Sequence, residues 1–278
     1  MPTQPFPADL ARELFETTAL MHPNTIPTLL QVARRVLIWI EPLLYRVVCS
    51  SSHPAILRAT KSKPPAFFHS AVRHLFLDGS TSDAWSFEEA TAVLRLCTGV
   101  INFAVIGNFS GPTLLPILAG MKVQRLTACL ELLFGDHAST DLALPAFASL
   151  THVDIFDEIL PDETKLCSSL PALPALTHLC LNNEVPPPTI QLLLATCPRL
   201  ALLVVLWPKT FAREGLSWVM DEAAPVIRDV RLVAGMYTDY WADWETGARG
   251  LPNFWTAAED FVAQKRSGAI AADQYWMD

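Results

Sequence analysis

Two histidines recur at matched places in the chain, within "LTHVDI" (150–155) and "LTHLCL" (176–181). Imidazole nitrogens are common metal ligands, so His152 and His178 could hold a metal ion together if they lay on neighbouring strands. They occupy the same place of a repeated unit, however, and no third ligand recurs with them. We therefore expect a structural role near a turn for both histidines, and we expect no metal or other cofactor.

Acidic residues gather between positions 136 and 163, where no lysine or arginine occurs: Asp136, Asp141, Asp154, Asp157, Glu158, Asp162 and Glu163. Paired carboxylates can act as general acid and general base. No nucleophile or sugar-binding aromatic residue accompanies them, so a solvated acidic face is the default interpretation. Two alternatives stay open. One is a docking patch for a basic partner, and the other is a hydrolase that uses Asp154, Asp157 and Glu158.

Other catalytic signatures are missing from the sequence. "GNFSG" (107–111) is not the GxSxG motif, because its serine stands in the fourth place, and no phosphate loop or dinucleotide-binding glycine pattern occurs. The net charge of −8 argues against binding to a nucleic-acid backbone as the main function. We therefore predict no catalytic residue, no nucleic-acid partner and no enzyme activity.

The high apolar content points to a large buried core. Hydrophobic residues make up 51% of the chain, which a membrane protein or a soluble one with much buried surface could explain. The most apolar window, 190–207, contains Pro198 and Arg199, so it indicates a buried helix and strand, not a membrane span. The N-terminus lacks a secretory pattern and the six cysteines form no CxxC pair, so we expect buried thiols in a cytoplasmic or nuclear protein.

A pattern of apolar residues, apolar-x-x-apolar-x-apolar, recurs every 23–28 residues. Seven units are marked by their middle apolar residue: Leu75, Phe103, Leu126, Val153, Leu179, Leu203 and Val230. Each unit ends with the alternation of a half-buried strand. Helix-like runs lie between the units; the run 86–97 opens with Ser86 and has Glu89 three residues later, which is the spacing of a capping box. Because no unit can bury its apolar side alone, we expect neighbouring parallel strands joined by right-handed crossovers.

This pattern resembles the irregular, longer form of the leucine-rich repeat over residues 66–236. The asparagine typical of that repeat occurs only near Asn182 and Asn183. The resemblance implies that the residue between the last two apolar positions of each unit points to a concave, partner-binding face. A strip of seven strands is roughly 30 Å long, which suits a protein segment better than a metabolite. These residues are Phe76, Ala104, Thr127, Asp154, Cys180, Val204 and Arg231.

The N-terminal segment, 1–50, resembles an F-box. "FPADLARELF" (6–15) follows that family's opening, with Asp9 in the place of its acidic residue, and "LLQVARRVLIWIEPLLYRVV" (29–48) resembles its final helix. Ala33 departs from the family pattern, and the middle helix near 22–26 is eroded. The resemblance implies binding to a Skp-type adaptor protein. Phe6, Pro7, Leu10, Leu14, Phe15 and Val32 would form that surface. The alternative is a plain helical cap that binds no adaptor.

The C-terminal segment, 237–278, contains four of the eight tryptophans. "FWTAAEDFVAQKRSG" (254–268) indicates a helix that stops at Gly268. We expect a cap whose aromatic side chains cover the last repeat, and an aromatic ligand site is the alternative. The segment also resembles the tails of F-box-like proteins from mushroom-type fungi.

Together these features predict an α/β leucine-rich-repeat-like solenoid with parallel strands, an N-terminal F-box-like helical cap and a C-terminal helical cap. By resemblance, the expected function is a substrate receptor of a Skp–cullin–F-box ubiquitin ligase that binds an adaptor and an unknown protein substrate. A binding scaffold with a relict F-box is the alternative. We expect no contact with a membrane.

Overall fold

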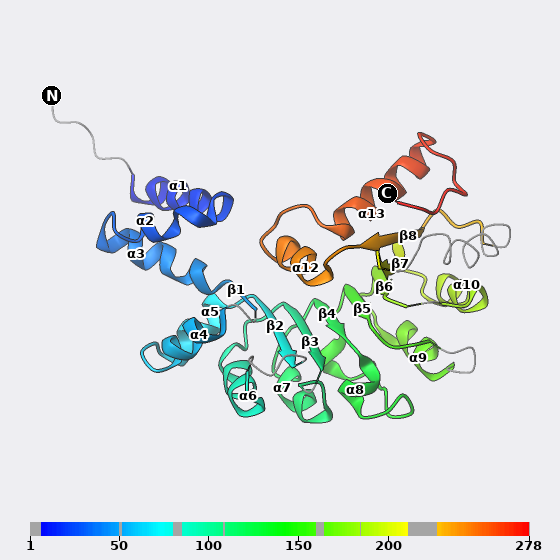
Figure 1. Cartoon of the computed structure of the whole chain (residues 1–278), viewed down its shortest axis with the longest axis horizontal. Helices are drawn as coiled ribbons and strands as arrows, with labels where there is room; N and C mark the ends of the chain where they lie inside the picture. The colour runs from blue at the N-terminus through cyan, green and yellow to red at the C-terminus, as the bar shows by residue number, and fades with distance from the viewer. Residues whose placement is uncertain are drawn as a thin grey trace.

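In the described part of the chain, eight parallel strands form one open sheet and lie side by side in chain order (Figure 1). The computed structural model describes residues 7–49, 52–79, 85–107, 109–159, 164–183, 185–210 and 227–277. Parallel strands in sequential order confirm the prediction made from the repeat. The strands are β1 (Val47–Val48), β2 (His74–Gly79), β3 (Asn102–Gly107), β4 (Arg125–Ala128), β5 (His152–Ile155), β6 (His178–Leu181), β7 (Leu202–Pro208) and β8 (Leu232–Tyr237).

The strand register follows the apolar residues that mark the repeat. Leu75 pairs with Phe103, and the same row of pairs continues from strand to strand as far as β7. Every side chain in this row is at most 1% exposed, so the row forms the centre of the main core. The row consists of Leu75, Phe103, Leu126, Val153, Leu179 and Leu203.

The seventh marked residue, Val230, is not the partner of Leu203. Leu203 pairs with Leu232, so the last strand begins two residues later than the sequence pattern indicates. The residues before it form a turn, in which the guanidinium group of Arg231 donates to Asp229 Oδ2 at 2.6 Å and to the carbonyl oxygen of Leu200 at 3.2 Å. The predicted place of Arg231 in the concave strip is therefore wrong, and Val233 occupies that place.

A short first strand extends the sheet beyond the expected start of the repeats. β1 is only two residues long, and Val48 pairs with Leu75 of β2. It lies inside the segment that resembles an F-box, where the sequence indicates a helix up to residue 48. The helices α4 (His53–Thr60) and α5 (Pro65–Ala71) follow β1 and lead into β2.

Helices and short 3₁₀ segments connect the strands and lie along one side of the sheet (Figure 1). The start of α6 is an example of how the sequence determines where such a helix begins. The Ser86 hydroxyl accepts from the Glu89 N–H at 3.2 Å, and the Glu89 carboxylate accepts from the Ser86 N–H at 3.0 Å, which confirms the capping box. These elements are α6 (Phe87–Leu96), η4 (Pro112–Leu114), α7 (Leu115–Leu118), α8 (Leu130–Phe134), η5 (Pro145–Phe147), α9 (Thr164–Ser169), η6 (Leu170–Ala172) and α10 (Pro187–Thr196).

The apolar window 190–207 forms the end of α10 and most of β7, as predicted. No helix in the described ranges has both the length and the apolar character that a bilayer crossing requires. All six cysteines are free thiols, and five of them are buried. Cys97 ends α6 inside the core, and burial raises the pKa of its thiol to about 12. A structural role for this cysteine follows from that burial.

The N-terminal helices form a small unit with its own core at one end of the sheet (Figure 1). Ala19, Ile26, Val36 and Ile40 are the buried residues of that core. The unit comprises α1 (Ala8–Met21), η1 (Pro23–Thr25), α2 (Ile26–Leu29), α3 (Arg34–Ile40) and η2 (Glu41–Tyr45).

The two C-terminal helices, α12 (Tyr240–Ala248) and α13 (Phe254–Ser267), lie on the side of the sheet opposite to α6–α10 (Figure 1). The residues after α13 return to the outer edge of β8. There Ala234 forms a parallel bridge with Trp276, its N–H donates to the Tyr275 carbonyl at 2.8 Å, and its carbonyl accepts from the Met277 N–H at 2.8 Å.

Candidate functional site

The predicted concave strip does come together as one row on the sheet. Phe76 pairs with Ala104, and the pairing continues through the equivalent residue of each strand to β7. We call this set the inner-face row, with Val233 in place of Arg231. It consists of Phe76, Ala104, Thr127, Asp154, Cys180, Val204 and Val233.

The inner-face row is buried, so the prediction that it is an exposed partner-binding strip is wrong. No residue of the row is more than 6% exposed. The apolar members of the row form a second hydrophobic cluster with side chains from α12 and α13, among them Tyr240, Trp244 and Val262. The C-terminal helices therefore occupy the face that the sequence assigned to a partner protein.

Aromatic contacts hold α12 across the width of the sheet. The ring of Trp241 stacks on Phe76 of β2 with centroids 4.3 Å apart and on Phe156, just after β5, at 5.5 Å. Near β1, the thiol of Cys49 donates to the carboxylate of Glu245 at 3.6 Å. The C-terminal segment thus covers far more than the last repeat, which is all that the sequence indicates.

Local sequence signals set the ends of these two helices. The Asp239 carboxylate accepts from the N–H groups of Trp241 and Ala242 at the start of α12, and Asn253 caps α13 in the same way through Thr256. α13 ends at Gly268, whose φ of 75° is in the left-handed region that favours glycine. The predicted end of this helix at Gly268 is confirmed.

Asp154 is the one acidic member of the inner-face row and lies beneath α12. Its Oδ2 atom accepts from the Thr127 hydroxyl at 2.9 Å and from the Tyr240 hydroxyl at 2.6 Å. Burial raises the pKa of its carboxyl group to about 7, although both hydrogen bonds act to lower it. The carboxyl group therefore ties the helix to two strands, and burial opposes its ionisation.

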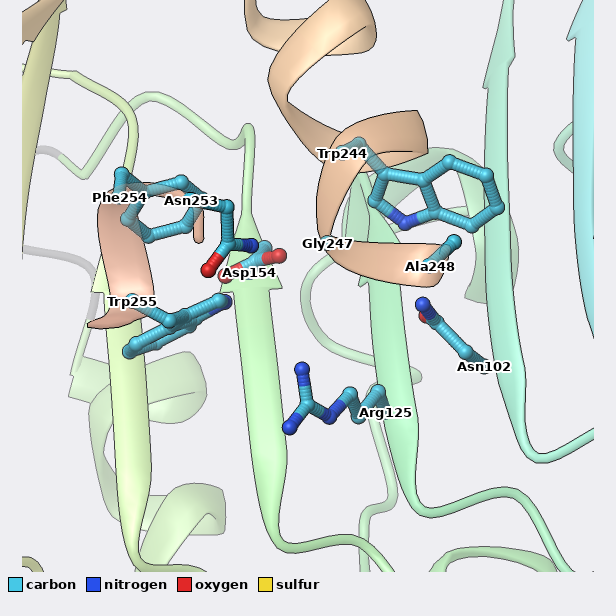
Figure 2. A pocket seen from close by; sticks show the side chains of 9 residues that line it. All are labelled: Asn102, Arg125, Asp154, Trp244, Gly247, Ala248, Asn253, Phe254 and Trp255. Atoms are coloured by element: carbon cyan, nitrogen blue, oxygen red, sulfur yellow. The ribbon is translucent and has the colours of Figure 1, made fainter. Parts of the chain in front are cut away.

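A small cavity remains beside Asp154, between the sheet and the C-terminal helices (Figure 2). Its volume of about 10 Å³ is close to that of a single water molecule. Figure 2 shows Arg125 and Asn102 on the sheet side and Trp244, Asn253 and Trp255 on the helix side. The space is too small for a metabolite, and the aromatic side chains around it pack against one another and against the sheet.

A second row of polar side chains runs along the same face of the sheet, one position before the core row. We call it the histidine row; it consists of His74, Asn102, Arg125, His152 and His178, which pair in register. Burial is the main reason why the pKa of His74 is lowered to about 4 and that of His152 to about 2. The two recurring histidines are evident from the sequence, but the row as a whole was not predicted. The same repeat alignment, read one residue earlier in each unit, contains it.

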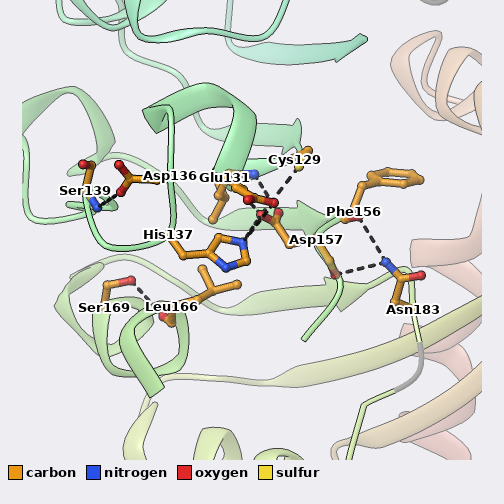
Figure 3. Close-up of polar contacts among 11 residues, drawn as sticks. Cys129, Glu131, Asp136, His137, Ser139, Phe156, Asp157, Leu166, Ser169 and Asn183 are labelled. Carbon is orange, nitrogen blue, oxygen red and sulfur yellow. Dashed lines mark hydrogen bonds and ion pairs between the residues drawn. The ribbon is translucent and has the colours of Figure 1, made fainter. Parts of the chain in front are cut away.

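The carboxylates of the acidic segment do not form one site. The side chain of Asp157 is buried, and its two oxygens accept from the N–H groups of Leu130 and Glu131, each at 2.6 Å, and from His137 Nε2 at 3.0 Å (Figure 3). Asp157 thus caps the start of α8 from the next repeat, whereas Asp154 bonds to Thr127 and Tyr240.

Two further acidic residues of the segment, Asp136 and Asp141, bond within local turns. Asp136 accepts from the Ser139 N–H at 2.6 Å (Figure 3), and Asp141 accepts from the Ala143 N–H at 3.0 Å. Glu158 is exposed, and the predicted members Asp162 and Glu163 lie outside the described residues. The default interpretation of a solvated acidic face is wrong for Asp154 and Asp157, because both are buried.

The asparagines that follow β6 bond to the preceding repeat. The amide group of Asn183 donates to the carbonyl oxygens of Phe156 and Asp157 at 3.1 and 3.0 Å (Figure 3). Asn182 donates to the carbonyl oxygen of Ile155 at 3.4 Å. These two residues therefore link adjacent turns of the chain by their side chains.

The described members of the set predicted to bind an adaptor belong to the N-terminal helical unit or directly precede it. Leu10 and Leu14 on α1 are 50% and 59% exposed, and Val32 in the turn before α3 is 56% exposed. Pro7 precedes α1 and is exposed, whereas Phe15 packs against the small core of the unit. Phe6 lies outside the described residues.

The final helix of this unit is shorter than the sequence indicates. Residues 29–48 divide into the end of α2, a turn, α3, the 3₁₀ segment η2 and the strand β1. Val36 and Ile40 are buried on α3, but Val32 lies before α3 and is 56% exposed. Pro42 stands at the start of η2, where a missing N–H interrupts a regular helix.

Comparisons of this sequence with protein-family models, with curated proteins and with solved structures gave no match. What the two regions can do therefore follows from their own residues. One region is a sheet face filled by the C-terminal helices, and the other is a helical unit with apolar side chains in solvent.

Proposed function

We propose that this chain is an adaptor-binding protein of the Skp–cullin–F-box type, which holds a protein substrate for ubiquitination and performs no chemistry itself. The observation that carries the proposal is the exposure of apolar side chains on the N-terminal helical unit. An exposed apolar surface on a folded unit is typical of a site for another protein.

The exposed apolar side chains are concentrated in this unit. Eight of the twelve large hydrophobic residues that are exposed in the described chain lie between positions 10 and 44. The other four are spread over the remainder of the described ranges. The eight are Leu10, Leu14, Leu20, Met21, Val32, Leu37, Ile38 and Leu44.

The unit does not need these side chains for its own packing. Its core uses Ile26, Val36 and Ile40, with Phe15 and Trp39 packed against them. The rings of Phe15 and Trp39 lie 6.5 Å apart. Apolar residues that a fold leaves in solvent at this density lower its solubility, so a partner that covers them is the simplest explanation.

The fold of the remaining chain agrees with a leucine-rich-repeat-like solenoid, which is the second part of the proposal. Parallel strands in chain order, one apolar core row and side-chain links between adjacent turns are the features that support it. The inner-face row holds the C-terminal helices in this arrangement. The protein substrate in this proposal therefore contacts side chains outside that row.

The adaptor contact can be tested with a double substitution, Leu10→Asp with Leu14→Asp. The intact chain should co-elute with a purified Skp-type adaptor in size-exclusion chromatography, and the double variant should not. Leu132→Asp with Leu192→Asp is the matched control, because those leucines are 47% and 45% exposed but lie on α8 and α10. The control should co-elute like the intact chain.

Failure of the intact chain to bind the adaptor would overturn this function. It would favour the other interpretation, a binding scaffold with a relict F-box. If both double variants lost binding, the contact would not be specific to the N-terminal unit. Val32→Asp offers a third position on the same unit, and we expect it to weaken binding without loss of the fold.

A further inference from the structure

The two Leu-Thr-His triplets stack their imidazole rings on the inner face of the sheet. The rings of His152 and His178 are 4.1 Å apart and lie within 3° of parallel. The ring of Trp255, from α13, stands edge-on to both at 5.2 and 5.6 Å. The strand register and the indole thus place the two imidazoles side by side on this face of the sheet.

The threonine of each triplet fixes which ring nitrogen carries the proton. Thr177 Oγ1 donates its one proton to the carbonyl oxygen of Thr151 at 3.2 Å and lies 2.8 Å from His178 Nδ1. Thr151 Oγ1 donates in the same way to Gln124 at 3.1 Å and lies 2.9 Å from His152 Nδ1. A hydroxyl whose proton is committed can only accept, so each Nδ1 carries a hydrogen. Each Nε2 therefore has a lone pair in the neutral ring.

A third ligand atom reaches this place from outside the repeat. Glu259 on α13 brings Oε1 to 3.1 Å from His178 Nε2. One ring nitrogen from each histidine and one Glu259 carboxylate oxygen all lie within 4.8 Å of one another. His152 Nε2 is buried and has no hydrogen-bond partner. Glu259 does not recur with the histidines in the repeat, so the repeat pattern gives no sign of this third ligand.

We propose that His152 Nε2, His178 Nε2 and the Glu259 carboxylate bind a divalent transition-metal ion of the zinc type. The contact between His178 Nε2 and Glu259 Oε1 requires a cation between the lone pairs, either a proton or a metal ion. Two imidazoles and a carboxylate are typical ligands for zinc, whereas calcium and magnesium take oxygen ligands.

The geometry needs only a small adjustment. Tetrahedral ligands about 2.0–2.1 Å from zinc lie about 3.3 Å from one another. The Glu259 and His178 atoms are already at 3.1 Å. The farthest pair must therefore approach by at most about 1.5 Å, which a tilt of one imidazole supplies. Hydrogen bonds from Nδ1 to a neighbouring oxygen are the usual second contact of metal-bound histidines, and the two threonines provide it.

A bound ion would connect α13 directly to β5 and β6. Glu259 is exposed, so the ion can enter from solvent, and the fourth ligand would be water. Arg125 occupies the next place in the histidine row, and its positive charge opposes a cation, so the Glu259 carboxylate is essential to the site. The ion would stabilise the arrangement in which the C-terminal helices cover the inner face.

Calorimetric titration of the full, chelator-treated chain with Zn²⁺ tests the site. We expect one ion per chain, and a rise in the thermal midpoint with zinc concentration. Glu259→Gln and His178→Ala each remove a ligand of the ion. Each should weaken zinc binding by more than the roughly 10–100-fold that is typical when only the hydrogen-bond partner of a ligand is lost. Thr177→Val should weaken it by about 10–100-fold, because it removes only that second contact.

Matched controls separate this site from adventitious binding. Asp260→Asn changes the neighbouring exposed carboxylate on α13, and His22→Ala removes an exposed histidine of the N-terminal unit. Both should bind zinc like the unmodified chain. Co²⁺ in the site should show no thiolate charge-transfer absorption.

Three results would overturn the proposal. The first is the lack of one-to-one zinc binding. The second is binding that survives both Glu259→Gln and His178→Ala. The third is a cobalt spectrum dominated by thiolate ligands. Because Glu259 is on the surface, Glu259→Gln keeps the test valid even if His178→Ala fails to fold.

Discussion

The N-terminal and C-terminal helices both carry apolar side chains, but these have opposite surroundings. α12 and α13 bury Tyr240, Trp244 and Trp255 against the inner face of the sheet. The N-terminal unit buries a few residues in its own small core and leaves Leu10 and Leu14 in solvent. A periodic apolar face thus indicates that other residues cover this face of the helix. It does not show whether the same chain or another molecule covers it.

Removal of a buried aromatic side chain should give the largest effect in this comparison. Trp244 is 5% exposed, and its ring lies 5.8 Å from that of Phe76. Trp244→Ala should lower the free energy of unfolding by about 3–5 kcal/mol, because it leaves a cavity between α12 and the sheet. Denaturant unfolding measures this change. A loss below about 1 kcal/mol would mean that α12 is not firmly packed on the inner face.

Asp154→Asn should change the pH dependence of stability. Burial raises the pKa of Asp154 from 3.8 to about 7, so the folded state holds a proton that the unfolded state releases between these values. The favourable contribution of the protonated carboxyl group is complete below pH 4 and lost as pH rises through 7. The neutral Asn variant should therefore gain stability relative to wild type from pH 4 to 8, by at most about 4 kcal/mol.

The comparison of the two unfolding curves over this pH range measures that difference. The amide oxygen of the variant can still accept from Thr127 and Tyr240, so the hydrogen bonds to Oδ2 are retained. Parallel stability–pH curves for the two proteins would show that Asp154 is not buried by α12.

Lys265 provides a smaller and opposite pH effect on α13. Its ammonium group is buried, donates to the Leu232 carbonyl at 2.7 Å and lies over the rings of Phe261 and Tyr275. Burial lowers its pKa from 10.5 to about 8. The buried ammonium group therefore lowers the free energy of unfolding of wild type below pH 8, and this destabilisation disappears as pH rises to 10.5. Between pH 8 and pH 10.5, the free energy of unfolding of wild type should rise by about 1–2 kcal/mol relative to that of Lys265→Met. Unfolding at pH 8 and at pH 10.5 gives the difference, and an equal response of both proteins would contradict it.

The smallest effect on stability is expected on the exposed face of α1. Leu10→Asp with Leu14→Asp should change the free energy of unfolding by no more than about 0.5 kcal/mol, because both side chains are already in water. Thermal and denaturant unfolding of the isolated chain would measure it. A large loss of stability would mean that these leucines pack within the protein, and the contrast with the C-terminal helices would disappear.

The repeat spacing was enough to predict the sheet. Apolar positions such as Leu75 and Phe103 recur because each strand must contribute one side chain to a shared core row, so period and register follow from the same constraint. The last unit deviates because Leu232 lies 29 residues after Leu203, beyond the predicted range, and a turn held by Arg231 precedes the strand. β1 was missed because two residues carry too little alternation to identify a strand.

The covering of the inner face could not be predicted from that spacing. Trp241 contacts Phe76, and Glu259 contacts His178, but neither C-terminal residue has a periodic relation to the repeats. The sequence shows that a row such as Thr127 and Cys180 shares one face. Which segment fills that face depends on a long-range packing choice that no local pattern encodes.

The chain's last described residues have a consequence for how any partner can recognise the repeats. Trp276 and its neighbours pair with the outer side of β8, where the backbone N–H and carbonyl groups of Ala234 are already bonded. A ligand that binds by adding its own strand needs a row of such groups without partners. At Ala234, on the β8 edge of the sheet, the chain's own C-terminal residues already occupy the place of such an added strand.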